Sequence, residues 1–374
     1  MADTNYFPPA GAWERAKPES VGLDPATIRA AADFAVAQET LWPRSINDFY
    51  VNEMKEPPPW NKIIGPVRDR GGPSGVILRG GRIVAEWGDI ERADMTFSVT
   101  KSYVSTCVGL AQDAGLIKDL DAPVRDLVDD GGFDSAQNRP ITWKHLLQQT
   151  SEWEGTLWDK PDLIDRNRVV GAGASTVQTG TAKGTDRKLQ KPGSYWEYND
   201  VRVNRLSLAA MRVWRRALPD LLKEKIMNPI GASPRWEWHG YENSWVEIDG
   251  KRMQSVSGGA HWGGGLFIST LDHARLGYLF LRRGNWAGRQ LLSADWIGKA
   301  TQPCAINPHY GFMWWLNSDG KAWPGVSRES FMALGAGSSL IWVDPTTDIV
   351  AVARWIKGDA IPAFVARIAK AVRE

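Results

Sequence analysis

The sequence predicts an α/β protein of the α+β kind, in which a mixed, mainly antiparallel sheet flanked by helices carries an inserted, mostly helical domain. Strand-like runs lie towards both ends of the 374-residue chain, whereas the middle is mostly helical and loop-like in pattern. Hydrophobic residues make up 43% and charged residues 24%, which is typical of a globular chain with a large core. We expect residues 1–95 and 236–374 to form the sheet domain and residues 96–235 the helical domain.

The first elements are a helix and a hairpin. In "LDPATIRAAADFAVAQ", Asp24 is the expected N-cap and Pro25 the first helical residue. Apolar residues then recur at helical spacing, starting with Ile28 and Ala31. "SGVILRGGRIVAEWG" predicts two strands joined by a turn at Gly80-Gly81.

The middle of the chain contains a helix and long loops. "KSYVSTCVGLAQDAGLI" is helical in pattern and ends near Gly115. One face of this helix carries Tyr103, Cys107, Leu110, Ala111 and Ala114. Residues 151–195 are rich in Gly, Thr, Asp and Lys and have no clear period, so they predict loops of the length that is often functional.

The C-terminal third returns to strands. "SGGAHWGGGLFIST" is a glycine-rich entry into an apolar strand. "SSLIWVDPTTDIVAVARWI" predicts two strands around a turn at Asp344-Pro345. "IPAFVARIAKAVRE" predicts a closing amphipathic helix.

Charge and composition exclude several classes of function. Forty-five basic and 43 acidic residues leave a net charge of +2, and no basic arm stands out, so we expect no nucleic-acid partner. No run reaches the ~18 apolar residues of a membrane span, and no N-terminal secretory signal is visible, so we expect a cytoplasmic protein without a membrane partner. Two cysteines, Cys107 and Cys304, make no disulfide scaffold. The oligomeric state is left open.

A serine and a lysine three residues apart are the first catalytic candidates. Ser98 and Lys101 would face one side of a helix turn, where the lysine can act on the weakly nucleophilic hydroxyl. Unpaired N–H groups at a helix start can also stabilise an oxyanion. The alternative is an N-cap serine beside a solvated lysine. A second Ser-x-x-Lys, Ser318 to Lys321, lies in a polar stretch that predicts a surface loop.

Two further segments complete a possible site. Tyr198-Asn199-Asp200 stands directly before a helical run, and Gly335-Ala336-Gly337 precedes an apolar strand. Taken alone, the tyrosine would be an ordinary half-buried core residue. The glycines alone would mark a strand start or a bulge.

Together with "ESVGLD", "PITWKHLLQQTSEW" and "YGFMWWLN", these motifs resemble the serine β-lactamase/DD-peptidase superfamily. The resemblance is to its class C-like branch of family VIII-type esterases, amidases and 6-aminohexanoate-dimer hydrolases. It covers the chain from about Pro18 to the C-terminal helix and implies the β-lactamase/transpeptidase-like fold.

The resemblance also implies the roles of individual residues. Ser98 would be the acylated nucleophile, and Lys101 with Tyr198 would be the general base pair. The oxyanion hole would use the backbone N–H groups of Ser98 and Ala336. Unperturbed Tyr and Lys both titrate near ~10, so the site has to favour proton loss from at least one of them.

Two departures from the motifs of this superfamily narrow the class of substrate that we expect. Penicillin-recognising relatives carry Lys-Thr-Gly where this chain has Gly335-Ala336-Gly337, so a cation for a substrate carboxylate is missing. Asp200 replaces the usual Asn and can only accept hydrogen bonds when ionised. It could pair with Lys101 or Arg202, or receive a substrate N–H, and we favour a structural pairing.

The predicted function is that of a serine hydrolase for small esters or amides, with β-lactamase or DD-peptidase activity, or an inactive binding protein of the same fold, as alternatives. No Gly-x-Ser-x-Gly, His-Glu-x-x-His, Cys-x-x-Cys or nucleotide-binding fingerprint occurs, so we expect no metal and no cofactor. Indole rings near the motifs would favour an apolar or extended acyl chain. The substrate-contact candidates are Asp200, Trp158, Trp262, His261, Gly335 and Gly337.

Overall fold

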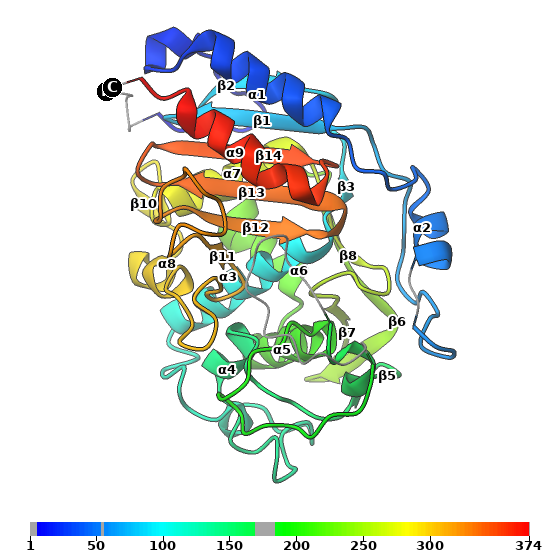
Figure 1. The fold of residues 1–374 in the computed structure, drawn as a ribbon. Helices are drawn as coiled ribbons and strands as arrows, with labels where there is room; N and C mark the ends of the chain where they lie inside the picture. The colour runs from blue at the N-terminus through cyan, green and yellow to red at the C-terminus, as the bar shows by residue number, and fades with distance from the viewer. Residues whose placement is uncertain (1–5, 54–55, 169–183, 374) are drawn as a thin grey trace.

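A six-stranded antiparallel sheet forms the centre of the protein, as Figure 1 shows for the computed structural model, which describes residues 6–53, 56–168 and 184–373. The strand order is β11-β12-β13-β14-β1-β2. The strands are β1 (Ser74–Arg79), β2 (Arg82–Trp87), β11 (Trp315–Leu316), β12 (Phe331–Gly335), β13 (Ser339–Asp344) and β14 (Ile349–Arg354). The N-terminal hairpin therefore joins the sheet beside the last strand of the chain, β14.

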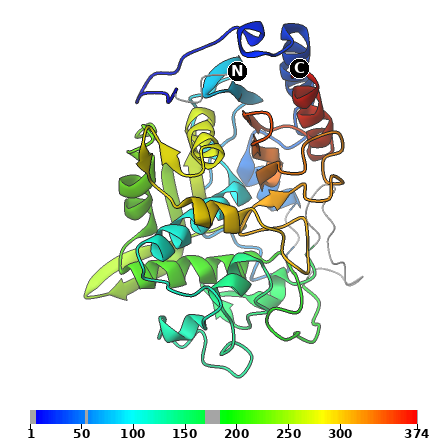
Figure 2. The same cartoon turned by 90° about the vertical axis from the view of Figure 1, so that its left-hand side faces the viewer.

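Helices cover both faces of this sheet. The first and last helices, α1 (Pro25–Ala37) and α9 (Ile361–Lys370), pack together on one face. Helix α7 (Thr270–Leu281) packs against β13, β14 and β1 on the other face. Figure 2 shows these layers from the side. The predicted sheet flanked by helices is confirmed.

The middle of the chain forms a helical part below the sheet in Figure 1, with a second sheet beside it. Its helices are α3 (Thr100–Asp113), α4 (Trp143–Leu147), α5 (Asp200–Trp214) and α6 (Leu218–Leu222). The second sheet has the order β3-β8-β6-β7, with β3 (Asp94–Met95), β8 (Gly265–Ile268), β6 (Glu237–Ile248) and β7 (Lys251–Val256). Smaller elements are α2 (Ile46–Glu53), α8 (Ala294–Ala300), β4 (Thr156–Leu157), β5 (Lys160–Pro161), β9 (Asn285–Trp286) and β10 (Arg289–Gln290).

Strand pairing agrees with the mainly antiparallel sheet that we predict. All pairings between the named strands in the described ranges are antiparallel. Parallel pairing is limited to isolated bridges such as Arg15 with Ile83. Hairpin turns and short connections join most neighbouring strands, and such connections produce antiparallel pairs.

Local sequence signals account for the predicted N-terminal elements. The Asp24 carboxylate accepts a hydrogen bond from the Thr27 N–H at 2.8 Å, and Pro25 is the first residue of α1. Gly80 and Gly81 both have positive φ, at 56° and 83°, and form the turn between β1 and β2. This conformation costs glycine little and most other residues more.

Helix α3 forms where the sequence predicts a helix and ends at Asp113, close to the predicted end at Gly115, but it is buried over more than the one predicted face. Residues from Thr100 to Ala111 are buried on every side, whereas Ala114, placed on the apolar face, is exposed. Helix α5, α8 and strand β12 all pack around α3, so its polar face is covered by protein rather than by water. A helix that is covered on all sides has no polar face towards solvent, so the spacing of apolar and polar residues does not indicate how much of the helix is buried.

The 151–195 segment is only partly loop. It contains β4, β5 and a 3₁₀ turn at Asp162–Asp165. Residues 169–183 of this segment lie outside the described residues. The second Ser-x-x-Lys lies in a surface loop as predicted, because Lys321 has a side chain that is 82% exposed.

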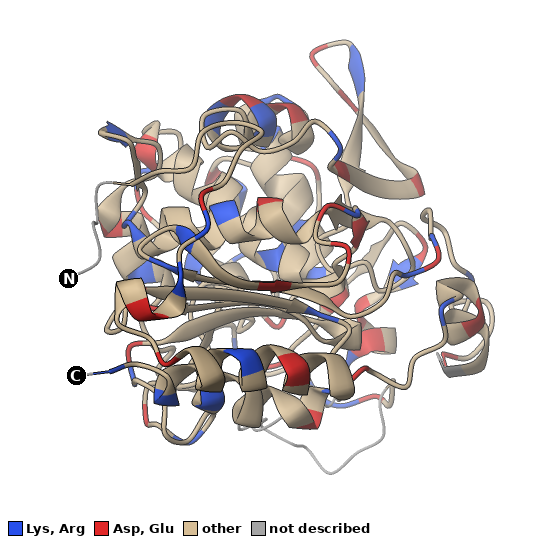
Figure 3. Ribbon diagram, turned by 90° about the horizontal axis from the view of Figure 1, so that it is seen from above, with Lys and Arg blue, Asp and Glu red and all other residues tan. Residues whose placement is uncertain are grey.

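One buried arginine connects the two sheets. Arg354 at the end of β14 is 1% exposed and donates to the carbonyl oxygens of Asp94 at 3.0 Å and Met95 at 2.7 Å, and also to that of Ile268. In the ribbon of Figure 3, the Lys, Arg, Asp and Glu positions otherwise lie mostly on helices and loops, while the central strands carry few of them. Among the helices of the described ranges, none combines the length and apolarity needed to cross a bilayer.

Two helical glycines allow a test of the packing. A Cβ at Gly277 would lie 2.7 Å from side-chain atoms of both Ile341 and Val350, whereas a Cβ at Gly298 would meet no atom within 4 Å. We expect Gly277→Ala to lower the free energy of unfolding by about 1–3 kcal/mol through overpacking. Gly298→Ala should raise it by about 0.4–1 kcal/mol. Urea denaturation followed by circular dichroism measures both, and equal effects would contradict the described packing of α7.

Candidate active site

Ser98 lies in a single 3₁₀ turn, Phe97–Val99, directly before α3. Phe97 has a φ of 48°, which is uncommon for a residue with a side chain. Its ring meets Trp42 and Trp355 edge-on, with centroids 5.4 and 6.4 Å away. Packing of this ring therefore holds the turn that presents the serine.

Lys101 lies one helical turn further on and contacts the serine directly. Its Nζ is 2.8 Å from Ser98 Oγ. The same Nζ forms an ion pair with Asp200, and both side chains of this pair are only 1% exposed. Burial disfavours the Asp200 carboxylate, but the charges of Lys101, Arg168 and His261 outweigh burial and hold the pKa of Asp200 well below its usual range.

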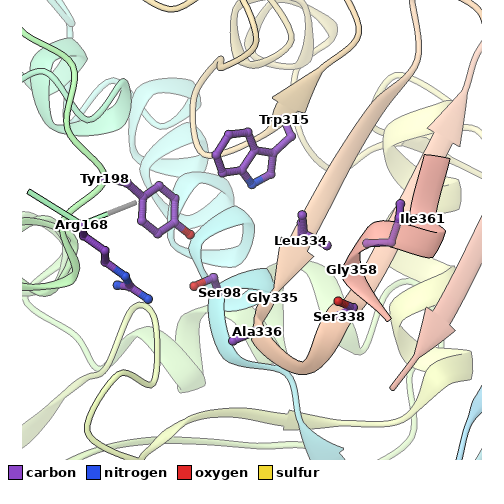
Figure 4. Close-up of a pocket in the computed structure, with 10 residues that line it drawn as sticks. All are labelled: Ser98, Arg168, Tyr198, Trp315, Leu334, Gly335, Ala336, Ser338, Gly358 and Ile361. Carbon is purple, nitrogen blue, oxygen red and sulfur yellow. The ribbon is translucent and has the colours of Figure 1, made fainter. Parts of the chain in front are cut away.

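Tyr198 reaches the same place from the start of α5. Asn199 caps this helix by accepting from the N–H of Arg202 at 3.2 Å. The Tyr198 ring stacks on Trp315 at a centroid distance of 5.7 Å, and Lys101 Nζ lies 4.5 Å from the ring centre. The Tyr198 hydroxyl points towards Ser98 in Figure 4. The structure thus brings the three predicted catalytic residues together.

A cavity of about 210 Å³ opens in front of Ser98. Ser98 lies between a polar side with Tyr198 and Arg168 and an apolar side with Leu334 and Ile361, as Figure 4 shows. The lining residues are Ser98, Arg168, Tyr198, Trp315, Leu334, Gly335, Ala336, Ser338, Gly358 and Ile361. The arrangement can hold a small uncharged acyl compound against the serine hydroxyl.

Strand β12 ends against the Phe97–Val99 turn that contains Ser98. A Cβ at Gly335 would lie 2.2 Å from the Thr96 carbonyl oxygen and 3.1 Å from the Ser98 nitrogen, so only glycine allows this approach. Ala336 follows at the cavity wall beside Ser98. Gly337 faces the other way, because a Cβ there would lie 2.5 Å from the Trp355 ring.

Asp200 contacts Lys101, one of the two cations that the sequence offered as partners, the other being Arg202. Arg202 lies instead at 2.7 Å from both Glu152 and Asp162, in a separate buried network. The second Asp200 oxygen pairs with Arg168, which also lies 3.5 Å from Asp165.

Of the six predicted substrate-contact residues, only Gly335 lines this cavity, and five lie outside its lining: Asp200, Trp158, Trp262, His261 and Gly337. His261 is 2.7 Å from Glu56 and 3.9 Å from Asp200, so it lies behind the ion pair. Trp262 is fully buried against His261 and Tyr241. Trp158 lines a different cavity. The indole at the cavity wall is that of Trp315.

Sequence reasoning did not single out Arg168, Trp315, Leu334 or Ile361 as wall residues. Trp315 and Leu334 lie within or beside quoted motifs, so the motifs could have suggested them. Arg168 lies in the segment that we predict to be a functional loop, but no local pattern distinguishes it from its neighbours. Its placement depends on a contact with Asp200, 32 residues away in the chain.

The fold and the Ser98-Lys101-Tyr198 cluster are those expected of the serine β-lactamase/DD-peptidase superfamily. Residues 61–358 match the family model described as Beta-lactamase, and the chain belongs to this family.

Solved structures show the same fold at low sequence identity. EstCE1, a hydrolase with promiscuous acyltransferase activity, is 16% identical with a TM-score of 0.57, and the match covers 94% of this chain and 100% of that one. A family VIII carboxylesterase is 17% identical with a TM-score of 0.55 over 87% and 95% of the two chains. A penicillin-binding protein homologue from Caulobacter crescentus is 16% identical with a TM-score of 0.57 over 94% and 99%.

The close approach of Gly335 makes a prediction about catalysis. Gly335→Ala has to push β12 away from the Ser98 turn, and a displacement of ~1 Å can cost ~10²-fold in rate. We expect a fall of this order in the acylation rate by a fluorophosphonate, measured by stopped-flow labelling. Gly358→Ala, where the nearest atom to a Cβ would be Ser338 Oγ at 3.4 Å, is the control and should stay within a few-fold of the parent. Unchanged acylation in a folded Gly335→Ala protein would contradict the proposed contact.

Proposed function

We propose that this protein is a serine hydrolase that cleaves small esters or amides through an acyl-enzyme on Ser98. The observation that carries the proposal is the 2.8 Å contact between Ser98 Oγ and Lys101 Nζ, in a cavity that also contains Tyr198. A serine hydroxyl in hydrogen-bond contact with a lysine, in a cavity that a tyrosine also lines, has the groups that covalent catalysis needs.

Acylation would begin with attack of Ser98 Oγ on the acyl carbonyl carbon. The Lys101–Tyr198 pair would take the hydroxyl proton and deliver it to the leaving alkoxide or amine as the carbon–leaving-group bond breaks. Backbone N–H groups of Ser98 and Ala336 would stabilise the oxyanion, an interaction worth ~10²–10³-fold for one donor. Water, deprotonated by the same pair, would then release the acid and regenerate Ser98.

The cavity walls favour an uncharged substrate. Trp315, Leu334 and Ile361 are apolar, and the Gly335-Ala336-Gly337 segment carries no cation. Arg168, the one charged side chain in the described lining, already pairs with Asp200 and approaches Asp165. A substrate carboxylate would have to compete with these two buried carboxylates, which argues against β-lactam or peptidoglycan-peptide recognition.

Nucleophile substitution tests the core of the proposal. We expect Ser98→Ala to abolish fluorophosphonate labelling and turnover of p-nitrophenyl esters, because no hydroxyl remains to be acylated. Tyr198→Phe should lower kcat/KM by about 10²–10⁴-fold through loss of proton transfer. Mass spectrometry locates the adduct, and circular dichroism checks folding.

Ser318→Ala, in the second Ser-x-x-Lys, is the matched control and should keep full activity. Ordinary turnover by Ser98→Ala would end the proposal. A folded parent protein that is neither labelled nor active would support the alternative of a binding protein of this fold.

The apolar side of the cavity predicts a preference for acyl or alcohol chain length. Ile361→Ala removes side-chain volume there, so kcat/KM should shift towards p-nitrophenyl esters longer by one or two methylenes, each worth ~0.8 kcal/mol. Ile368→Ala on the same helix removes an equally buried side chain that is not among the cavity-lining residues. It should lose stability without a shift in preference. The same shift in both variants would mean that Ile361 does not bound the substrate.

A further inference from the structure

Asp200 lies at the centre of a buried cluster of charges behind the nucleophile. One carboxylate oxygen pairs with Lys101 and the other with Arg168. Its own backbone N–H donates to Asp165 at 2.5 Å, at the first residue of α5. Both oxygens and the N–H are therefore engaged, and these contacts fix the carboxylate in one orientation.

Gly259 seals this ion pair from the side of the second sheet. A Cβ at position 259 would lie 1.7 Å from the bound Asp200 oxygen and 2.4 Å from Lys101 Nζ. The backbone at 259 thus occupies the space through which water would otherwise reach both charges. A water-excluded ion pair is stronger than an exposed one, and loss of either partner leaves a costly buried charge.

Charged and titratable groups surround the ion pair of Asp200 and Lys101. The charged and titratable groups that face the pair come from four segments: Arg168 and Asp165 from the 162–168 segment, His261 with Glu56 behind it, and Tyr198 before α5. The buried hydroxyls of Tyr50 and Tyr241 also lie within reach of the Asp200 charge. Arg168 is a fixed cation that contacts Asp200 and Asp165, and its charge favours the ionised form of the Asp200 carboxylate, which in turn favours the ammonium form of Lys101.

We propose that Asp200 is a positioning residue that holds Lys101 as an ammonium ion beside Ser98 throughout the reaction. This inference rests on the proposed function and assigns different roles to Lys101 and Tyr198, which the proposed function treats as a pair. Tyr198, as phenolate, would take the Ser98 proton as the Oγ–acyl bond forms. It would pass that proton to the leaving group as the second bond breaks, while Lys101 keeps its proton and only stabilises the phenolate charge.

The charge state of Lys101 is measurable in the unmodified protein. Lysine Cε chemical shifts, recorded by NMR on protein with ¹³C-labelled lysines, separate ammonium from neutral amine, and loss of one resonance in Lys101→Arg assigns Lys101. We expect its Cε shift to stay at the ammonium value through the pH of maximal kcat/KM. A neutral-amine shift at that pH would overturn the inference. This experiment needs no Asp200 variant to fold.

The Asp200→Asn substitution keeps the shape of the side chain and removes its negative charge. Without the carboxylate, the charges of Lys101 and Arg168 are uncompensated, and positive potential favours proton loss from neighbouring groups. We expect both limbs of the kcat/KM profile to move to lower pH by about one unit, with fluorophosphonate acylation retained and KM little changed. An unshifted profile, or a folded variant that cannot be acylated, would contradict a positioning role.

Asp130→Asn is the matched control for a lost buried carboxylate. Asp130 also bridges two arginines, Arg205 and Arg212, and is absent from the lining of the Ser98 cavity. It should lose stability like Asp200→Asn but keep the parent pH profile. Gly259→Ala should reproduce the profile shift of Asp200→Asn by forcing the pair apart, and a parental profile in this variant would count against the inference.

Different experimental results would refute the inference about Asp200 and the proposed function. If Ser98→Ala loses labelling while Lys101 titrates identically in the parent and Asp200→Asn, Ser98 chemistry stands and the role of Asp200 falls. If the folded parent is not labelled, the proposed function itself falls.

Discussion

The contact between the end of β12 and the turn that carries Ser98 constrains the rest of the site. Gly335 approaches the backbone of residues 96–99 so closely that no side chain fits between them. This contact sets the serine against the cavity wall formed by the strand, and the ring of Phe97 is held behind it by two tryptophans. Arg354 adds a second connection, from the central sheet to the carbonyls of β3, just before the turn. The position of Ser98 therefore depends on sheet packing more than on the helix that follows it.

Behind Ser98 the protein keeps charges where hydrophobic residues would be easier to bury. Such charges are tolerated when each has a partner, and the partner contacts fix geometry as well as energy. Around Ser98 the partners come from the first turn of α3, the start of α5 and the segment that ends at Arg168. A separate network of Arg202 with Glu152 and Asp162 supports the same end of α5. The polar side of the cavity is thus held by ion pairs and the apolar side by sheet and helix packing.

Sequence reasoning succeeded where the determining signals are local or are carried by a family motif. Caps and turn glycines predicted α1 and the first hairpin, and three ordered motifs predicted that Ser98 and Tyr198 would meet. It predicted α3 as a helix but not its burial on all sides, because its pattern indicated only one apolar face. It did not single out Arg168 or Gly259, because each acts through a contact with Asp200 or Lys101 that is distant in sequence. Tryptophans near the motifs in sequence were likewise a poor guide to the cavity wall, since Trp262 is enclosed in the core and Trp315 lines the cavity.

The site is assembled from segments spread over most of the chain, from residue 98 to residue 361. Loops between such segments have to close before any of their contacts forms, which makes this kind of topology slow to fold. A partly folded chain can contain α3 with Ser98 and Lys101 in register and still lack the strand, the phenol and the carboxylate that complete the site. Formation of the complete site after dilution from denaturant therefore reports the last steps of folding, when the two ends of the chain have joined the central sheet.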